Sequence, residues 1–494
     1  MPSEDRTDNI KEQKEENEAL VHYGNSEISN MQSACERGEG GALEWLEQTR
    51  RRISLLDQAG VKLNAILEWN LEAEGIAYAS DHERIKKGAR SLLHGIPILL
   101  KDNIETGDAM HASGGALALA DRFADRDSFI AARLRASGAV LCGKTNMTEL
   151  ANFMTENMPN GYSSRGGQVR HAWKADADPS GSSTGSAVAV AAGYVPLAIG
   201  TETCGSITSP AAAAGIVALK PTIGWVSRRG IIPIAPSQDV AGPMARTVAD
   251  CAIAFSIIAG CDIEDPVTGI CAGHKIPEID RRRLNEKDLK GVRLGLFALD
   301  DEDKPIQCDA FYKAVKLLES MGAEIIPFSP PKDAARGMIT VFIHEFRPSM
   351  DAVLRHGTGP VRSMADLAAF NKAHSDVCLR YGQTNIEQAL SLERPMLTHE
   401  YVQSREIAHQ CLEELKNTFA LQSLDAVISL EGLIVFPVTG CPALTLPVGI
   451  DETKGMPVPI TINGLPFSEG KLLTIGAVLE AAIGKDFKPP LPLE

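Results

Sequence analysis

The order of apolar and polar residues along the chain predicts buried strands that alternate with helices. Residues 94–104, HGIPILLKDNI, contain a short continuous apolar run of the kind that a buried strand shows. Residues 127–150 follow as a helix, a glycine turn and the strand AVLCG. Residues 291–300 read as another strand, and residues 311–328 as a helix, a glycine turn and a further strand. This alternation predicts an α/β fold with a central mixed β-sheet covered by helices on both faces.

Further helices are expected before and after these elements. Residues 26–85 predict two or three N-terminal surface helices from the helical spacing of apolar residues such as Ile28, Met31, Leu43 and Leu46. Residues 330–420 are mostly helical and polar in pattern, which indicates a helical insertion over the sheet. Residues 1–25 are highly charged and are expected to form a disordered or frayed helical tail. We therefore expect a single large α/β domain over residues 26–494.

The composition is typical of a globular protein with a large core. Hydrophobic residues make up 44% of the 494 positions and charged residues 23%. The formal net charge of −15 argues against a nucleic-acid partner, because phosphate binding is driven by Lys and Arg. Aromatic residues, at 5%, are too few for a base-stacking surface.

The cysteines and the apolar runs indicate the compartment. The ten cysteines are scattered singly and no two have C-x-x-C spacing, so neither a zinc knuckle nor a redox pair is indicated. Isolated cysteines in a chain of this length are usually reduced. The N-terminus lacks the apolar core of a signal peptide. Glycines and prolines divide the nearly uncharged run 186–219 into short buried elements, so we expect a cytoplasmic protein with no membrane partner.

A hydroxyl-rich stretch at 178–193, DPSGSSTGSAVAVAAG, is the first candidate for chemistry. It contains G-x-S-x-G with Ser183 at its centre, but a nucleophile elbow needs an apolar strand before it and AWKADADPS is charged and turn-forming. The segment GTETCGS at 200–206 resembles a phosphate loop in spacing but lacks the lysine that reaches the phosphates. The histidines show no H-x-x-x-H pair, so no zinc site is indicated.

Three segments taken together support another interpretation: GIPILLKD with Lys101, SGSSTGS with Ser182, and GTETCGSITSPAA with Ser206. They resemble the amidase signature family of serine hydrolases, and are most similar in motif to its bacterial peptide-amidase-like members. Five further segments resemble the family in the same order: LCGKTN, GYSSRGG, LKPTIGWVSRRGIIPIAPSQDVAGPMARTVAD, EFRPSMDAVL and CPALTLPVG. The resemblance covers residues 26–485.

This resemblance implies a Ser–cis-Ser–Lys catalytic set with no histidine. By motif, Ser206 is the nucleophile, Ser182 is the serine that relays protons, and Lys101 is the base. Gly181, before the cis peptide bond, and Ser183 are supporting residues. The oxyanion hole is expected from the backbone N–H groups of Thr203, Cys204, Gly205 and Ser206.

A buried lysine can activate a serine without the help of histidine. A serine hydroxyl is a weak nucleophile until a base takes its proton. Lysine is such a base only when neutral, and burial lowers its pKa by disfavouring the charged form. The apolar GIPILL before Lys101 is consistent with a buried pocket. The neighbouring hydroxyls of Thr184 and Ser186 are expected to cap the helix that follows.

The expected function is an amide hydrolase that cleaves a carboxamide C–N bond through a seryl acyl-enzyme and releases ammonia or an amine. No metal and no organic cofactor are expected. The partner is a small-molecule amide, anilide, ester or carbamate, and the protein is a monomer or homodimer. Two alternatives remain: an esterase or carbamate hydrolase with the same catalytic residues, and an amidotransferase-type subunit that acts in a complex.

Two departures from the family pattern bear on specificity. Many members read G-G-S-I-R where this chain has CGSIT, and the arginine position is Thr208, which argues against the amidotransferase subunit. In residues 424–442, LDAVISLEGLIVFPVTGCP, the loop after the strand is shorter than in the peptide-amidase-like subgroup. In relatives this loop lines the substrate pocket, and the insertion at 330–420 is expected near the same pocket.

Overall fold

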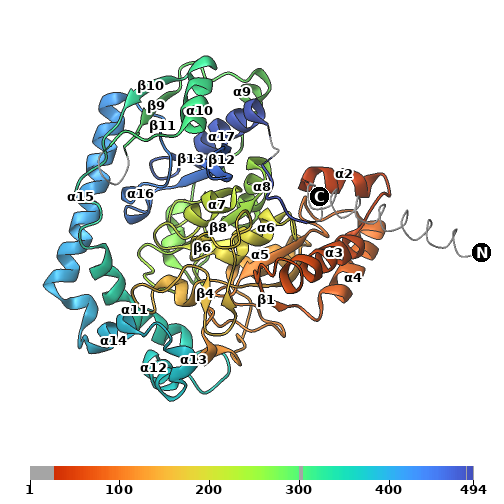
Figure 1. Ribbon diagram of the computed structural model, residues 1–494, viewed down its shortest axis with the longest axis vertical. Coiled ribbons are helices and arrows are strands. Elements are labelled where there is room, and N and C mark those ends of the chain that lie inside the picture. Colours follow the sequence, from red (N-terminus) through yellow and green to blue (C-terminus); the bar gives the residue numbers. More distant parts are fainter. Residues whose placement is uncertain (1–26, 300–303, 485–486, 493–494) are drawn as a thin grey trace, which may run out of the picture.

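A mixed sheet of 11 strands forms the centre of the described part of the chain (Figure 1). The computed structural model describes residues 27–299, 304–484 and 487–492, so the expected tail at 1–25 lies outside the described residues. The strands lie in the order β1-β3-β2-β6-β8-β7-β12-β13-β11-β9-β10. Their bounds are β1 Ile66–Trp69, β2 Pro97–Lys101, β3 Val140–Thr145, β6 Leu197–Glu202, β7 Val217–Lys220, β8 Val240–Ala245, β9 Arg293–Leu296, β10 Glu324–Pro327, β11 Ala426–Ser429, β12 Ala443–Asp451 and β13 Met456–Asn463. A separate hairpin pairs β4 Tyr162–Ser163 with β5 Gly167–Gln168.

Successive residues of β2 face opposite layers of helices. Ile98 and Leu100 belong to one buried apolar cluster and Leu99 to another, as the two-residue period of a strand requires. The first layer contains α2 Ile28–Glu36, α5 Phe129–Ala136, α8 Val248–Ile258, α9 Arg281–Glu286, α10 Asp309–Ser320 and α17 Glu469–Ile483. The second contains α3 Ala42–Arg52, α4 Ala73–Lys87, α6 Thr184–Ala191 and α7 Thr208–Ala214. The predicted α/β fold, with helices on both faces of a mixed sheet, is confirmed.

The strand β2 is parallel to both of its neighbours, β3 and β6. All five of its residues are buried, which explains why PILLK is a continuous apolar run that ends in one lysine. Parallel strands have their carboxyl ends at the same edge of a sheet. Lys101 at the end of β2 and the loop after Glu202 at the end of β6 therefore lie at one edge.

The predicted insertion between residues 330 and 420 is helical. It contains α11 Met338–Leu354, α12 Met364–Ala373, α13 Ser375–Cys378, α14 Thr384–Ser391 and α15 His399–Gln422, which lie along the left and lower margin of Figure 1. Phe346 of α11 is fully buried, and its ring lies 5.3 Å from that of Phe153 in an edge-to-face arrangement. The insertion is thus packed onto the body through apolar side chains. None of the described helices is long and apolar enough to cross a membrane.

One N-terminal element differs from the expectation. The helices α2, α3 and α4 begin within residues 26–85 as predicted and α4 ends at Lys87, but β1 lies between α3 and α4 and pairs antiparallel with β3. This edge strand has four residues, all only partly buried, and is too short for its periodicity to distinguish it from a loop. In α3, Trp45 and Leu46 are buried whereas Leu43 is exposed, so the buried face is displaced from the expected one.

Candidate active site

Two loops and one strand end meet at the carboxyl edge of β2 and β6. Lys101 ends β2, Ser182 lies in the loop before α6, and Ser206 lies in the loop between β6 and α7, here called the Ser206 loop (residues 203–207). The Nζ atom of Lys101 lies within hydrogen-bond distance of Ser182 Oγ, at 2.7 Å. The backbone N–H of Ser183 donates to the carbonyl oxygen of Ser206 at 3.2 Å. These contacts bring the three predicted catalytic residues together.

The buried amine of Lys101 has three oxygen neighbours. Besides Ser182 Oγ, its Nζ lies 2.9 Å from Ser183 Oγ and 3.1 Å from the carbonyl oxygen of Thr201. The Ser183 hydroxyl itself donates to the Thr201 carbonyl at 2.9 Å, so both of these oxygens accept from the lysine. A neutral amine has two N–H bonds and one lone pair. With its N–H bonds on these two acceptors, the lone pair faces Ser182 Oγ.

The protonation of Lys101 is set by burial and by two nearby acids. Burial lowers the pKa of Lys101 to about 7, because the interior disfavours the ammonium ion, while the charges of Glu202 and Asp239 act in the opposite direction. Asp102, the next residue along the chain, pairs with Arg165, with 3.4 Å between Oδ1 and Nη1. A neutral amine is therefore accessible to Lys101 near neutral pH.

The loop that carries Ser182 leaves no room for a side chain before it. A cis peptide bond joins Gly181 to Ser182, and Ser182 is fully buried. The carbonyl oxygen of Ser182 accepts from the backbone N–H of Thr148 at 3.1 Å. A Cβ atom at position 181 would lie 2.5 Å from Thr148 Oγ1 and 3.0 Å from Asn160 Oδ1. This close approach requires glycine.

The prediction that Thr184 and Ser186 cap the following helix is wrong. The N-cap of α6 is Ser183, and it makes no side-chain capping bond. Thr184 Oγ1 donates instead to the carbonyl of Ser180 at 2.6 Å, and Ser186 Oγ lies 2.8 Å from Thr145 Oγ1 in β3. The Thr184 hydroxyl closes a turn within the stretch, and the Ser186 hydroxyl joins the stretch to β3. The described residues directly before Ser183 form no strand, so the nucleophile-elbow interpretation does not fit.

Ser206 is the accessible member of the set. It is 8% exposed, whereas Lys101 and Ser182 are 0% exposed. Its hydroxyl makes no hydrogen bond with another described residue. Gly205, directly before it, has φ +82°, a left-handed backbone conformation that suits glycine. The loop therefore presents the least buried of the three side chains at the sheet edge where Lys101 and Ser182 lie.

The backbone N–H groups of the Ser206 loop fall into two groups. Those of Thr203, Cys204, Gly205 and Ser206 donate to no acceptor within the described part of the chain. Those of Ile207 and Thr208 donate to the Oε2 atom of Glu202 at 2.7 and 3.0 Å. Thr203, at the start of the loop, is held by its side chain, whose hydroxyl donates to Asp239 Oδ1 at 2.5 Å. Unoccupied N–H groups beside a serine Oγ can stabilise an oxyanion.

Cys204 lies two positions before Ser206 and is the other nucleophilic side chain of the loop. Burial raises the pKa of its thiol to about 12, and the charge of Glu202 acts in the same direction. Such a thiol is protonated at neutral pH, whereas the thiolate is the reactive form. Its side chain packs against an apolar cluster that includes Phe342 and Phe346 of α11. The side chain of Cys204 is thus part of the apolar packing around the loop.

Two buried carboxylates at the site were not predicted to take part. Glu202 ends β6 and is 2% exposed, and Asp239 directly precedes β8. Glu202 is also the only charged residue in the run 186–219. A lone charge in a buried apolar run must be compensated by hydrogen bonds or an opposite charge. The single charge in this apolar run is the sequence signal that could have identified Glu202.

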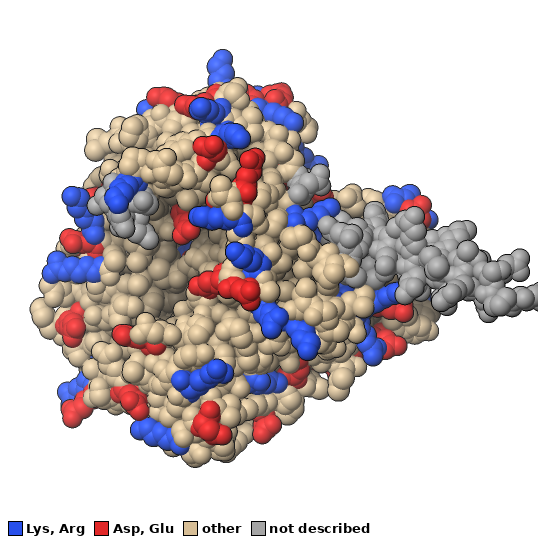
Figure 2. All heavy atoms as spheres, in the orientation of Figure 1, with Lys and Arg blue, Asp and Glu red and all other residues tan. Residues whose placement is uncertain are grey.

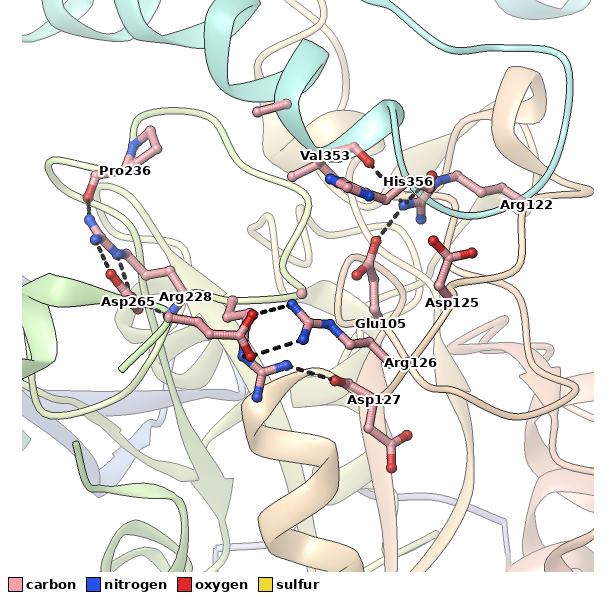
Figure 3. Close-up of a pocket in the computed structure, with 14 residues that line it drawn as sticks. Glu105, Arg122, Asp125, Arg126, Asp127, Arg228, Pro236, Asp265, Val353 and His356 are labelled. Atoms are coloured by element: carbon pink, nitrogen blue, oxygen red, sulfur yellow. Dashed lines mark hydrogen bonds and ion pairs between the residues drawn. The ribbon is translucent and has the colours of Figure 1, made fainter. Parts of the chain in front are cut away.

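A separate cavity of about 560 Å³ is lined mostly by charged side chains (Figure 3). The three predicted catalytic residues are not among those that line it. Its arginines are already paired: Arg126 Nη2 lies 2.5 Å from Glu264 Oε2, and the buried Arg122 pairs with Glu105. These pairs join neighbouring loops, so the cavity carries little unpaired charge. The described residues contain no group of three or more His, Cys, Asp or Glu side chains placed to hold a metal ion.

Known proteins resemble the chain in sequence and in structure. The family model named Amidase matches residues 44–430. A probable amidase of Arabidopsis thaliana is 35% identical over 438 residues, which cover 85% of this chain and 83% of the plant protein. One subunit of the glutamyl-tRNA(Gln) amidotransferase of Roseiflexus sp. strain RS-1 is 31% identical over 504 residues, covering 94% of this chain and 98% of that protein. The structure of native peptide amidase from Stenotrophomonas maltophilia has a TM-score of 0.89 and 36% identity, covering 95% of this chain and 99% of that chain.

The matched region includes all the elements that meet at the carboxyl edge of β2 and β6. The similarity to the amidase signature family and to a bacterial peptide amidase, expected from the motifs, is confirmed. The chain belongs to the amidase family and is an enzyme that hydrolyses amide C–N bonds.

Proposed function

We propose that Ser206, Ser182 and Lys101 carry out this hydrolysis through a seryl acyl-enzyme. The observation that supports the proposal most strongly is the contact of Lys101 Nζ with Ser182 Oγ. The other two oxygen neighbours of the amine, Ser183 Oγ and the Thr201 carbonyl, accept hydrogen bonds from it. Neutral Lys101 takes the hydroxyl proton of Ser182 while Ser182 Oγ takes that of Ser206. Ser206 Oγ then attacks the carbonyl carbon of the substrate.

The same groups complete the reaction. The substrate oxygen becomes negatively charged beside the N–H groups of Thr203, Cys204, Gly205 and Ser206, which stabilise it. As the C–N bond breaks, Lys101 returns the proton through Ser182 to the leaving nitrogen, which departs as ammonia or an amine. Water then attacks the ester of Ser206 by the same proton path, and the acid leaves.

The proposed substrate is a small carboxamide with an apolar, peptide-like acyl group. The apolar cluster against which Cys204 packs, which includes residues of α11, lies next to the Ser206 loop. The loop after β11 also reaches this region, because a Cβ atom at Gly432 would lie 3.4 Å from Thr208 Oγ1. Figure 2 shows a hollow in the face of the molecule where Figure 1 places the space between α15 and β6, and substrate is proposed to enter there. Similarity to the peptide amidase of Stenotrophomonas maltophilia supports the same substrate class.

A hydrolysis panel tests this proposal. Purified chain is incubated with peptide amides, simple aliphatic amides, anilides, esters and carbamates of matched acyl group, and product acid is measured. Peptide-like amides are expected to have the highest kcat/KM, with Ser206→Ala as the inactive control. A preference for esters or carbamates over every amide would favour the alternative hydrolase activity on the same residues.

An amidotransferase-type subunit is the second candidate, because the amidotransferase subunit of Roseiflexus sp. is similar over 94% of this chain. Such a subunit would work in a complex. The motif argues against it, since Thr208 stands where many family members have arginine, and here its hydroxyl donates to Glu202 at 3.2 Å. Gel filtration combined with amide hydrolysis by the isolated chain separates the two. Turnover by the lone chain is expected.

The cellular setting is inferred from composition. All ten cysteines are free, which is typical of a reducing compartment, and we infer a cytoplasmic enzyme. The net charge of −15 supports a small-molecule partner over a nucleic acid. We further infer one catalytic domain over residues 26–494, working as a monomer or homodimer without a metal or organic cofactor.

A further inference from the structure

We propose that Glu202 is a positioning residue that holds the Ser206 loop in its working shape and acts electrostatically on Lys101. The inference rests on the proposed roles of Lys101 as base and Ser206 as nucleophile. Two observations support it: the hydrogen bonds of the Glu202 carboxylate to the loop, and the position of Glu202 directly after Thr201, whose carbonyl oxygen lies 3.1 Å from the buried amine.

A single carboxylate oxygen closes the Ser206 loop. Glu202 Oε2 accepts from the backbone N–H of Ile207 at 2.7 Å, from that of Thr208 at 3.0 Å and from Thr208 Oγ1 at 3.2 Å. Glu202 ends β6 and Thr208 begins α7, so these bonds tie the two ends of the loop together. They also occupy the N–H groups of Ile207 and Thr208. The N–H groups left for a substrate oxygen are those of Thr203, Cys204, Gly205 and Ser206, which precede Ile207 in the loop.

The same carboxylate acts on the base. Two charged groups influence Lys101, namely Glu202 at the end of β6 and, more weakly, Asp239 from the segment before β8. Asp239 in turn holds Thr203 at the start of the Ser206 loop. The groups bonded directly to the amine, from Ser182, Ser183 and Thr201, are uncharged. The negative charge of Glu202 therefore raises the pKa of Lys101, whereas burial lowers it.

Glutamine and aspartate at position 202 separate the two effects. Glu202→Gln keeps an oxygen acceptor at the same reach but removes the charge, so the pKa of Lys101 should fall. The acid limb of kcat/KM is then expected to move to lower pH by about one unit. Glu202→Asp keeps the charge but shortens the side chain by one CH₂ group. Its acid limb is expected to stay near that of the wild type, while kcat falls by roughly 10- to 100-fold because the loop is displaced.

Glu469→Gln is the matched control. Glu469 is another fully buried carboxylate, which accepts from the Thr222 N–H at 2.7 Å and from Trp225 Nε1 at 3.0 Å, and it does not act on Lys101. Its variant is expected to keep the wild-type acid limb and a kcat within about threefold, even where its melting temperature falls.

The pH dependence of kcat/KM and kcat for a simple amide, measured for all four proteins, decides the matter. A Glu202→Gln enzyme with an unshifted acid limb, or a Glu202→Asp enzyme with full kcat, would overturn the proposal. If Glu202→Gln does not fold, the proposal is tested by Glu202→Asp alone, whose kcat is expected to be below that of the wild type. Failure of the proposed catalytic set has a different signature, because the wild type would then lack an acid limb and Lys101→Arg would remain active.

Discussion

The Nζ atom of Lys101 lies 2.7 Å from the Oγ atom of Ser182, although 81 positions separate the two residues in the chain. Both side chains are fully buried, so the hydrogen bond is shielded from water. It depends on the parallel pairing of β2 with β6 and on the loop before α6, which presents Ser182 to the strand end. The fold itself therefore brings the Lys101 amine into contact with the Ser182 hydroxyl.

The reaction rate should rise with pH as Lys101 loses its proton. Burial lowers the pKa of Lys101 to about 7, and below that pH the ammonium ion has no lone pair to accept a proton. We therefore expect kcat/KM to increase through neutral pH along one titrating limb. Lys101→Arg stays charged at usable pH and is expected to be nearly inactive. An arginine variant with near-normal turnover, or a flat rate from about pH 5 to 9, would remove Lys101 from the mechanism.

Ser182→Ala should lose rate and little stability. Without its hydroxyl the proton path from Ser206 to Lys101 is broken, and kcat is expected to fall by roughly 10²- to 10⁴-fold with KM much less changed. The matched control is Ser186→Ala, a buried hydroxyl that contacts Thr145 and not the lysine. The control is expected to lose about 1 kcal/mol of unfolding free energy and keep its rate. Steady-state kinetics and thermal melts would contradict this account if the two variants behaved alike.

Cys204→Ala should retain substantial turnover, whereas Ser206→Ala should lose nearly all of it. The pKa of the Cys204 thiol is raised to about 12 by burial, so it is protonated at neutral pH, and only its backbone N–H is expected to serve the reaction. The two variants are compared by kcat for one amide substrate. Loss of activity in Cys204→Ala together with an active Ser206→Ala would point to a thiol mechanism.

The attachment of the helical insertion can be tested at Phe346. This fully buried ring packs edge to face on Phe153, and Phe346→Ala is expected to reduce the unfolding free energy by about 3–5 kcal/mol through the cavity that it leaves. Leu397→Ala, at a position that is 79% exposed, is the control and should change stability by less than about 0.5 kcal/mol. Denaturant unfolding monitors both. Equal effects of the two substitutions would mean that Phe346 contributes little to the packing.

Elements with a strong local signal could be predicted from sequence. The run PILLK was recognisable as a buried strand because both faces of β2 are covered, so polar residues do not alternate with apolar ones. The helix–turn–strand unit of α5 and β3 follows from a glycine that ends a helix before an apolar run. The proposed catalytic residues Lys101, Ser182 and Ser206 were found by motif, and the structure brings them to one edge of the sheet.

Features that depend on contacts distant in sequence could not be predicted. The strand β1 is defined by its pairing with β3, and its four residues have no pattern of their own. Thr184 and Ser186 have the residue types of helix caps, but partners from Ser180 and Thr145 compete for their hydroxyls. The role of Glu202 depends on how the chain turns back from β6 into α7, which only the folded backbone defines.

The position of a covalent label tests the role of Ser206 most directly. A fluorophosphonate reacts with an activated serine oxygen, and peptide mass spectrometry then locates the modified residue. One label per chain is expected on Ser206, with loss of amidase activity in proportion to labelling, and neither Ser206→Ala nor Lys101→Arg should be labelled. A label on Ser182, Ser183 or Cys204, or full amidase activity after Ser206 has been modified, would contradict the assignment.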